Sequence, residues 1–498
     1  MIDLEGHLPA LQVVVPLLCA PLIVLLRPQG LAWAAATLAS ALAFAVACFL
    51  TVDALAGIEA SYALGSWPAP FGIALHVDEL SAIMLLIVTG ASTFVLIAAR
   101  QSIDADVDED RQPMFYSAWL LALAGLAGIV VSADAFNIFV FMEISSLASY
   151  ILIAGGPDRR ALPAVFKYLI MGTIGATFYL IGIGLIYMMT GTLNLGDMEL
   201  RIHEVSDQRP ILAAAGFITV GLALKAAVFP LHVWLPNAYT FAPNAVTAFL
   251  AACATKVSIY VLLRFDFFVF QQNLSGHDLQ FGYFLMPLAC LAIIVASGVA
   301  VFEPNIKRLL AYSSVAQIGY IMLGASLVSV AGLTASVAHL FNHALAKGVL
   351  FLAVIALAAR VSKLRLADLS GIAHRMPWTA AAMLVGGLSL IGVPGTAGFI
   401  SKWYLLTAAA EAGDLGWILV LVIVAGSLLA VIYVWRIVEA FYFAPATDRT
   451  GVERTEAPAG LLLVVWIAAM LNIVFGLHPE LPLDLSRAAA ASLLGHLP

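Results

Sequence analysis

The segment Leu222–Tyr239, "LALKAAVFPLHVWLPNAY", combines an apolar helix with residues that such a helix rarely contains. Small and apolar residues surround Lys225, and Pro230, His232 and Pro236 follow it. Pro230 removes a backbone hydrogen bond and clashes with the preceding turn. Inside lipid, the freed carbonyls need partners from protein or water. The segment therefore predicts a broken membrane helix whose lysine faces the protein interior or a hydrated path.

The composition of the whole chain indicates a membrane protein. Of its 498 residues, 63% are hydrophobic and only 11% are charged, and the mean hydropathy is +1.02. A water-soluble protein of this length needs far more charged surface. The net charge of −7, without a basic cluster, predicts no nucleic-acid partner. The four cysteines form no CxxC pair and no nucleotide-binding motif is present, so we expect no metal and no cofactor.

The apolar stretches are long enough to cross a bilayer repeatedly. About twenty apolar residues span the hydrocarbon core, and the chain contains about fourteen such stretches. We predict an all-α polytopic membrane protein with spans at 8–27, 31–54, 79–99, 114–131, 134–154, 163–189, 211–236, 242–265, 283–302, 310–329, 332–359, 377–412, 416–443 and 459–477.

The positive residues orient these spans. Most Lys and Arg lie in loops after odd-numbered spans, and the other side holds only Arg201, Arg209, Arg264 and Arg487. Positively charged loops face the cytoplasm. We therefore expect both termini on the outer side of a bacterial inner membrane. The aromatic stretch 60–79 becomes an outer loop with a hairpin.

Four lysines remain within the predicted spans: Lys225, Lys256, Lys347 and Lys402. Each would cost about 2.5–3.5 kcal/mol at the centre of a lipid-facing helix. A lysine near a helix end can extend its ammonium to the interface, but Lys256 lies well inside its span. The four lysines are therefore expected to line a protein interior or a hydrated path.

Further titratable residues share these spans. Glu143 is the one carboxylate expected deep in the bilayer, where its charge requires a lysine on a neighbouring span. A static ion pair is the alternative interpretation, although buried pairs contribute little stability. His339, His343 and Lys347 recur every four residues and so share one helical face. Histidine titrates near neutral pH, so this face predicts a proton relay.

A second broken helix is predicted where Pro394, Gly395 and Gly398 precede Lys402. Interrupted helices at matching positions of two halves indicate an inverted-repeat transporter. Spans four to eight would match spans nine to thirteen, and five helices per unit make the repeat inverted. The expected divisions are an N-terminal three-helix segment, two repeats, and a C-terminal helix with a tail, at 1–113, 114–265, 283–443 and 459–498.

Three further segments provide a resemblance to a known family. They are "LKAAVFPLHVWLPNAYTFAPNAVTAFLAACATKVSIYVLLR" (224–264), "EPNIKRLLAYSSVAQIGYI" (303–321) and "HLFNHALAKGVLF" (339–351). In this order they resemble the antiporter-like subunit family. That family comprises the proton-pumping membrane subunits of respiratory complex I, the large subunits of Mrp-type cation/proton antiporters, and relatives in membrane-bound hydrogenases. The resemblance implies fourteen core helices with both termini outside.

The resemblance also implies roles for individual residues. Glu143 matches the glutamate of the fifth helix, and Lys225 matches its lysine partner on the seventh. Pro230 and the nearby His232 match the motif that breaks the seventh helix. Proton translocation would continue through the central groups, which are Lys256, His339, His343 and Lys347, and end at Lys402.

Several branches of the family remain open. The segment "PGTAGFISKWYLL" (394–406) is similar to the D-type subunit of Mrp antiporters. We therefore expect a transport subunit for Na⁺ and protons that works with other integral membrane subunits in a lipid bilayer. The alternatives are an N-type subunit of a proton-translocating NADH:quinone oxidoreductase, a subunit of a membrane-bound hydrogenase, or a scaffold with static charges. A lysine at 402 disfavours the M-type, and the L-type and Mrp A-type chains are longer.

Overall fold

The structure, a computed structural model, describes residues 5–26, 29–270, 284–445 and 455–495. In this part of the chain, eleven helices are long and apolar enough to cross a membrane, and three shorter apolar helices accompany them. Together they match the fourteen predicted spans in order. The prediction of an all-α polytopic membrane protein is therefore confirmed.

The N-terminal segment packs against the rest of the bundle through three long helices. Its elements are α1 (Leu8–Val24), α2 (Gln29–Leu55), β1 (Ala60–Ala63), β2 (Ala74–Val77), α3 (Glu79–Ala98) and the short α4 (Arg100–Asp106). Strands β1 and β2 pair antiparallel, with Ala60 opposite Val77 and Ala63 opposite Ala74. The hairpin predicted for this loop is present.

Two five-span units follow in the sequence. The first contains α5 (Gln112–Val131), α6 (Ala135–Ala154), α7 (Ala161–Thr190), α8 (Leu195–Ile202), α9 (Arg209–Ala226), α10 (Leu235–Phe241), α11 (Asn244–Leu263) and the π-helical turn η4 (Arg264–Val269). The second contains α13 (Met286–Phe302), α14 (Ile306–Ser326), α15 (Val330–Ala358), α16 (Ile372–Arg375), α17 (Pro377–Ile391), α18 (Ala397–Ala410) and α19 (Gly416–Val438). The remaining helices are α20 (Ala459–Leu477) and α21 (Glu480–Leu493), so part of the expected C-terminal tail is helical.

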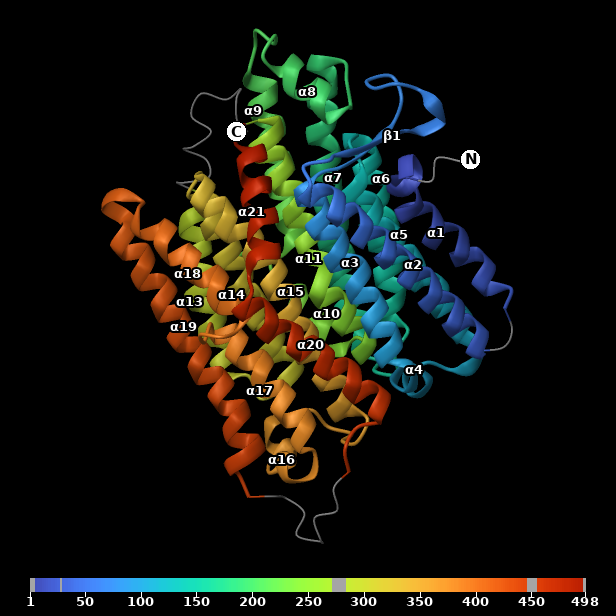
Figure 1. The fold of residues 1–498 in the computed structure, drawn as a ribbon, viewed down its shortest axis with the longest axis vertical. Helices are drawn as coiled ribbons and strands as arrows, with labels where there is room; N and C mark the ends of the chain where they lie inside the picture. Colours follow the sequence, from blue (N-terminus) through green and yellow to red (C-terminus); the bar gives the residue numbers. More distant parts are fainter. Residues whose placement is uncertain (1–4, 27–28, 271–283, 446–454, 496–498) are drawn as a thin grey trace.

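Matching helix starts show that the two units have opposite orientations. The Asp134 carboxylate caps α6 by accepting from the Asn137 N–H at 2.7 Å, and Asp134 forms a β-bridge with Asn194 beside α8. Asn305 caps α14, and it forms the equivalent bridge with Arg365 in the segment before α16. In Figure 1, α8 lies at the upper end of the bundle and α16 at the lower end. The repeat is therefore inverted, as predicted, while its domain boundaries stay a prediction.

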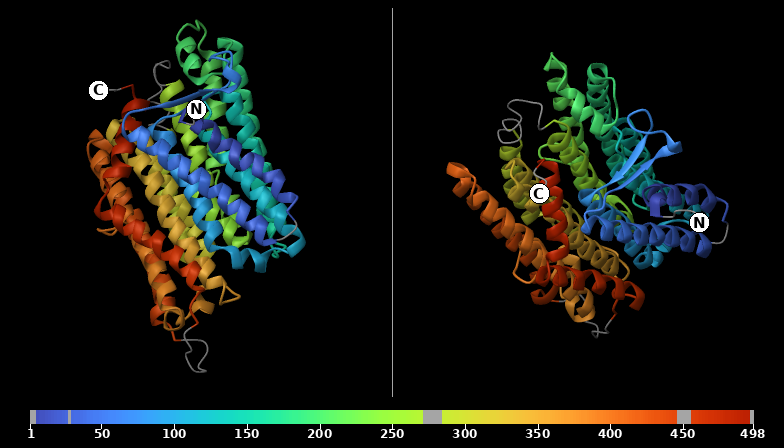
Figure 2. Two further views of the ribbon diagram at one scale, coloured as in Figure 1. Left: turned by 45° about the vertical axis from the view of Figure 1, so that its right-hand side comes forward. Right: turned by 45° about the horizontal axis from the view of Figure 1, so that its top comes forward.

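The start of α1 and the end of α21 lie toward the same end of the bundle in Figure 1. The views in Figure 2 show the C-terminal helices on the outside of the second unit, beside the N-terminal helices. Helix α21 packs on α15 and α3, and α20 packs on α15 and α17. The long α15 is thereby enclosed on several sides, and its residues are buried over nearly the whole length. The centre of the molecule is a helix with three titratable side chains on one face.

Candidate ion-translocation site

The first helix break lies where the sequence predicted it. Helix α9 ends at Ala226, and Ala227 adopts a left-handed conformation with φ of 56°. The chain then turns through Pro230 and His232 before α10 begins at Leu235. The indole N–H of Trp234 donates to the carbonyl of Leu224 at 2.9 Å, so one freed carbonyl has a partner across the break.

Lys225 occupies the last turn of α9 and extends toward α6. Its ammonium donates to Ser146 Oγ at 2.8 Å and lies 3.3 Å from Glu143 Oε1. The lysine side chain is only 6% exposed, whereas that of Glu143 is 32% exposed. The predicted pair therefore forms between a buried cation and a carboxylate at the edge of the protein. Glu143 lies near the middle of α6, as expected, and is only partly buried within this chain.

A close helix contact fixes the direction of Lys225. A Cβ atom built on Gly175 of α7 would lie 2.8 Å from the carbonyl oxygen of Gly221. One built on Gly221 would lie 2.5 Å from the carbonyl of Gly175. Real side chains do not tolerate such distances, so both positions require glycine. Helices α7 and α9 consequently pack backbone to backbone directly beside the lysine.

A small polar cavity connects Lys225 with α11. Its volume is about 30 Å³, and its lining includes Ser146, Ser149, Lys225 and Ser258. This is sufficient for about one water molecule with several hydrogen-bond partners. The cavity also touches Val257, which adjoins Lys256 on α11. A water molecule in this cavity would lie between Lys225 and the part of α11 that carries Lys256.

Lys256 is completely buried in the centre of α11. Its ammonium donates to the carbonyl of Ala251 in its own helix. In the described part of the chain, no carboxylate forms an ion pair with it. It lies close enough to His343 and Lys347 on α15 to interact with them electrostatically. An unpaired buried ammonium is costly.

The predicted relay face of α15 is present, but its members differ in their partners. His339 Nδ1 lies 2.8 Å from Ser401 Oγ, and His339 Nε2 lies 2.8 Å from Gln317 Oε1. The ring of His343 stacks on that of His339, with centroids 6.2 Å apart. Both ring nitrogens of His343 lack a hydrogen-bond partner among the described residues. A buried group of this kind requires water or a mobile neighbour.

Lys347 completes the face with short hydrogen bonds to α14. Its ammonium donates to the carbonyl of Leu310 and to Ser313 Oγ, both at 2.6 Å. The three side chains of the relay face are at most 3% exposed. The face therefore forms a buried, titratable row through the centre of the protein.

The second helix break surrounds Pro394. Gly392 and Gly395 have φ of 90° and 87°, which L side chains rarely adopt. Lys402 reaches back from α18 across this break, donating to the carbonyls of Leu390 at 2.8 Å and Ile391 at 3.1 Å. It also contacts Ser427 Oγ and the ring of Tyr320. Its charge thus stabilises the C-terminal end of α17.

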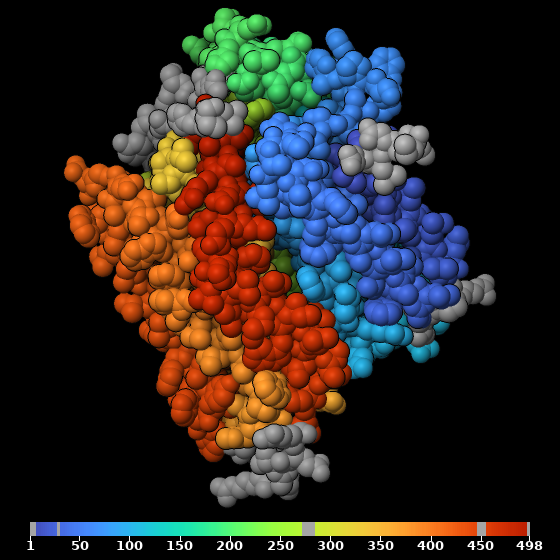
Figure 3. Space-filling model, in the orientation of Figure 1, coloured from blue at the N-terminus to red at the C-terminus, as the bar shows by residue number. Residues whose placement is uncertain are grey.

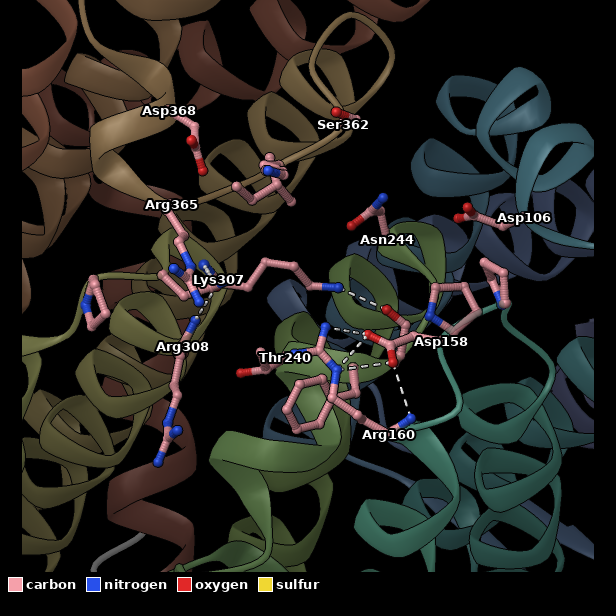
Figure 4. A pocket seen from close by; sticks show the side chains of 18 of the residues that line it. Asp106, Asp158, Arg160, Thr240, Asn244, Lys307, Arg308, Ser362, Arg365 and Asp368 are labelled. Carbon is pink, nitrogen blue, oxygen red and sulfur yellow. Dashed lines mark hydrogen bonds and ion pairs between the residues drawn. The ribbon is translucent and has the colours of Figure 1, made fainter.

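A larger polar cavity opens at the lower end of the bundle between the two units. Its volume is about 700 Å³. Figure 4 shows Lys307 of the second unit extending toward the first, and Lys307 donates to the carbonyl of Ala242 at 2.7 Å. Burial raises the pKa of the nearby Asp106 carboxyl, and the Lys307 ammonium opposes this shift. Hydrogen bonding to Arg160 lowers the pKa of Asp158.

Sequence reasoning missed several buried charges. Asp266 is 1% exposed and accepts from Thr219 at 3.3 Å, so this carboxylate at a span end is more buried than Glu143. Arg264 forms a buried ion pair with Asp78, although its position suggested a helix end. These residues lie at predicted span boundaries, where sequence alone gives no measure of burial. The available signal was that Asp78 and Arg264 carry opposite charges at span ends predicted on the same side of the membrane.

Comparison with known proteins places this architecture among ion-translocating membrane subunits. Residues 132–430 match the family model "NADH:quinone oxidoreductase/Mrp antiporter, TM". The chain is 38% identical over 496 residues to the N-type subunit of the NADH-quinone oxidoreductase of Desulforudis audaxviator, covering 96% of this chain and 97% of that one. It is 29% identical to the D-type subunit of the Na(+)/H(+) antiporter of Alkalihalophilus pseudofirmus, covering 90% and 89%.

A solved structure has the same fold. It is the membrane-bound sulfane sulfur reductase, described as an archaeal respiratory membrane complex, and one of its chains superposes with a TM-score of 0.91. The identity is 29%, and the match covers 98% of each chain. The chain therefore belongs to the NADH:quinone oxidoreductase/Mrp antiporter transmembrane family. It is an antiporter-like, multi-pass membrane subunit.

Proposed function

We propose that this chain conducts protons as the D-type subunit of a multisubunit Mrp-type Na⁺/proton antiporter. The observation that supports conduction is the row of buried titratable groups between the two helix breaks. It runs from the Glu143–Lys225 pair through Lys256 and the α15 face to Lys402. Named relatives of this family include a D-type subunit of an Na(+)/H(+) antiporter.

The proposed mechanism begins at Lys225. While Glu143 is 3.3 Å away, it favours the protonated lysine. When the pair separates, the buried ammonium loses this stabilisation and releases its proton. Water in the serine-lined cavity passes the proton to Lys256, and the α15 face passes it to Lys402. The breaks at Pro230 and Pro394 supply room for side chains and water to move.

The polar cavity around Lys307 is the proposed water-filled entrance on the cytoplasmic side. The chain would then lie in a bacterial inner membrane with both termini outside. Other integral membrane subunits would contact it, and the partly exposed Glu143 suits such a contact.

One specific observation favours a second function. The 38% identity to the N-type oxidoreductase subunit of Desulforudis audaxviator exceeds the 29% identity to the antiporter subunit of Alkalihalophilus pseudofirmus. As an N-type subunit, the chain would conduct protons by the same row of residues, driven by redox chemistry elsewhere in the complex. A hydrogenase-type complex would use the chain in the same way.

Purification of the native complex distinguishes these functions. Small hydrophobic antiporter subunits as partners would support the Mrp assignment, whereas NADH-binding and iron–sulfur subunits would support the second function. Ion transport by the same complex tests conduction. Replacing Lys225 or Glu143 with alanine is expected to abolish proton movement while assembly persists. Normal transport by an assembled Lys225→Ala complex would refute the mechanism.

A further inference from the structure

Lys307 at the start of α14 is a buried lysine that the row between the two helix breaks leaves unused. The residue is only 4% exposed, and it forms part of the wall of the polar cavity at the lower end of the bundle. Its ammonium donates to the carbonyl of Ala242 at 2.7 Å. Among the described residues, no carboxylate forms an ion pair with it. A buried ammonium with a neutral partner alone is poorly compensated.

Two carboxylates act on Lys307 across the cavity. Figure 4 shows Lys307 extending from the second unit toward the side where Asp106 and Asp158 lie, and both interact with it electrostatically. Asp158 is already paired with Arg160 at 2.8 Å. Oδ2 of Asp106 is buried and has no hydrogen-bond partner within the described part of the chain. The volume of about 700 Å³ leaves room for many water molecules between Asp106 and Lys307. The other charged residues of the lining are Glu303, Arg308, Lys363, Arg365 and Asp368.

One face of α14 leads from Lys307 to the relay residues of α15. Lys307, Leu310 and Gln317 follow at i, i+3 and i+10, which places them on one side of the helix. The carbonyl of Leu310 accepts from the Lys347 ammonium at 2.6 Å, and Gln317 Oε1 lies 2.8 Å from His339 Nε2. Leu310 is about 4.5 Å from Lys307 along the helix axis. The cavity and the relay row therefore meet the same helix face within one turn of each other.

The relay residues are covered on the face of the molecule drawn in Figure 3. There α20 and α21 form a continuous red band between the blue N-terminal helices and the orange helices of the second unit, and both pack on α15. Lys347 is 0% exposed, so its ammonium has no direct contact with solvent. The cavity at Lys307 instead reaches α14, whose Leu310 carbonyl and Ser313 hydroxyl hold Lys347. A route along the bundle axis therefore joins the cavity to Lys347.

We propose that Lys307 carries protons from the cavity to Lys347 and thereby loads the row. This role rests on the proposed function and adds an entry in the second unit. The flexible lysine stem lets the ammonium leave the carbonyl of Ala242. Protonated Lys307 then gives one proton through bridging water to neutral Lys347, and a proton from cavity water restores Lys307. From Lys347 the proton refills the row through Lys256 to Lys225. Each turnover therefore passes through Lys307.

A static role for Lys307 predicts a different result from the same substitution. As a tie between the two units, Lys307 would need only a positive charge and a donor for the carbonyl of Ala242. Arginine supplies both, but it does not release its proton. Lys307→Arg therefore keeps the tie and removes the transfer step. Lys363→Arg is the matched control, because Lys363 lines the same cavity and is exposed. Lys307→Met covers the case in which Lys307→Arg does not assemble.

Two measurements on the assembled complex test the proposal. A pH-sensitive dye inside vesicles measures the rate of proton transport. We expect Lys307→Arg and Lys307→Met to lower this rate roughly 100-fold, the loss that follows removal of a proton-transfer group, whereas Lys363→Arg should transport normally. Reductive methylation of the unsubstituted complex, which modifies only neutral amines, should mark Lys307 and leave Lys347 unmodified, as mass spectrometry can show.

The outcomes separate this role from the proposed function. Normal transport by either assembled Lys307 variant would overturn the proton-carrying role and leave conduction intact. Slow transport by Lys307→Met together with normal transport by Lys307→Arg would assign Lys307 the static role. Absence of methylation at Lys307 would show that its amine does not face the cavity water, which also overturns the proposal. An unsubstituted complex that moves no protons would refute the proposed function itself, whatever the methylation of Lys307.

Discussion

The two helix breaks hold their lysines by different chemistry. At the first break, Lys225 lies beside a carboxylate and a serine hydroxyl. At the second, Lys402 caps two carbonyls of α17 and has no carboxylate partner among the described residues. Separating Lys225 from Glu143 changes the charge around one ammonium. Moving Lys402 leaves the end of a helix without donors. The first site is therefore suited to switching the proton affinity of Lys225. At the second site, Lys402 also stabilises the end of α17.

The largest expected effect is on transport through the first site. Lys225→Ala removes the ammonium that Glu143 controls, and loss of a proton-transfer group costs roughly 100-fold or more in rate. A pH-sensitive dye inside vesicles that contain the assembled complex measures the rate. Lys167→Ala, at an exposed position on α7, is the control and should transport normally. Equal transport rates for Lys225→Ala and Lys167→Ala would show that Lys225 is not part of the proton pathway.

A stability measurement tests the second site. Lys402→Met leaves the carbonyls of Leu390 and Ile391 without their charged donor, which costs about 2 kcal/mol or more of unfolding free energy. Lys225→Met should cost less, because Glu143 is partly exposed and Ser146 can bond elsewhere. Denaturant unfolding of the purified subunit compares the two variants. A larger loss for Lys225→Met would reverse the contrast between the sites.

Glu143→Gln tests whether the first site depends on charge. The amide can still accept a hydrogen bond from Lys225, but it no longer stabilises the ammonium. Because the amide keeps the hydrogen bond that alanine would remove, and solvent screens the third-exposed carboxylate, we expect transport to fall roughly tenfold, less than the loss expected for Glu143→Ala. Glu411→Gln, at an exposed loop position, should leave transport unchanged. A rate as low as that of Lys225→Ala would mean that the charge itself is indispensable.

The smallest effect concerns the first break alone. Trp234→Phe removes the hydrogen bond to the carbonyl of Leu224 and should lower the unfolding free energy by about 1 kcal/mol. Transport should persist, since the lysine and its partners remain. Trp417→Phe, at an exposed position, serves as the control for thermal unfolding. An unchanged stability would show that water replaces the indole as the donor.

The sequence was sufficient to predict the spans, the two breaks and the inverted repeat. Proline and glycine act through local backbone geometry, so Pro230 and Pro394 mark the breaks whatever surrounds them. The fourfold spacing of His339, His343 and Lys347 likewise follows from helix geometry. These features depend on nearby residues in the chain.

The partners of these residues could not be predicted in the same way. Ser146, Gln317 and Ser401 are ordinary polar residues in apolar helices, and only helix packing brings them to Lys225 and His339. The burial of Asp266 and the partial exposure of Glu143 also depend on which helix faces meet. The difference between a hydrogen-bonded His339 and an unpartnered His343 arises for the same reason.

The contact between Gly175 and Gly221 determines the direction in which the side chain of Lys225 extends. A Cβ on Gly175 would lie 3.3 Å from Cγ of Lys225, so the lysine stem passes over the space that a side chain there would fill. A single hydrogen atom at that position lets the stem cross α7 and aim its ammonium at α6. The direction of a charge in the membrane is thus set by the absence of a methyl group on the neighbouring helix.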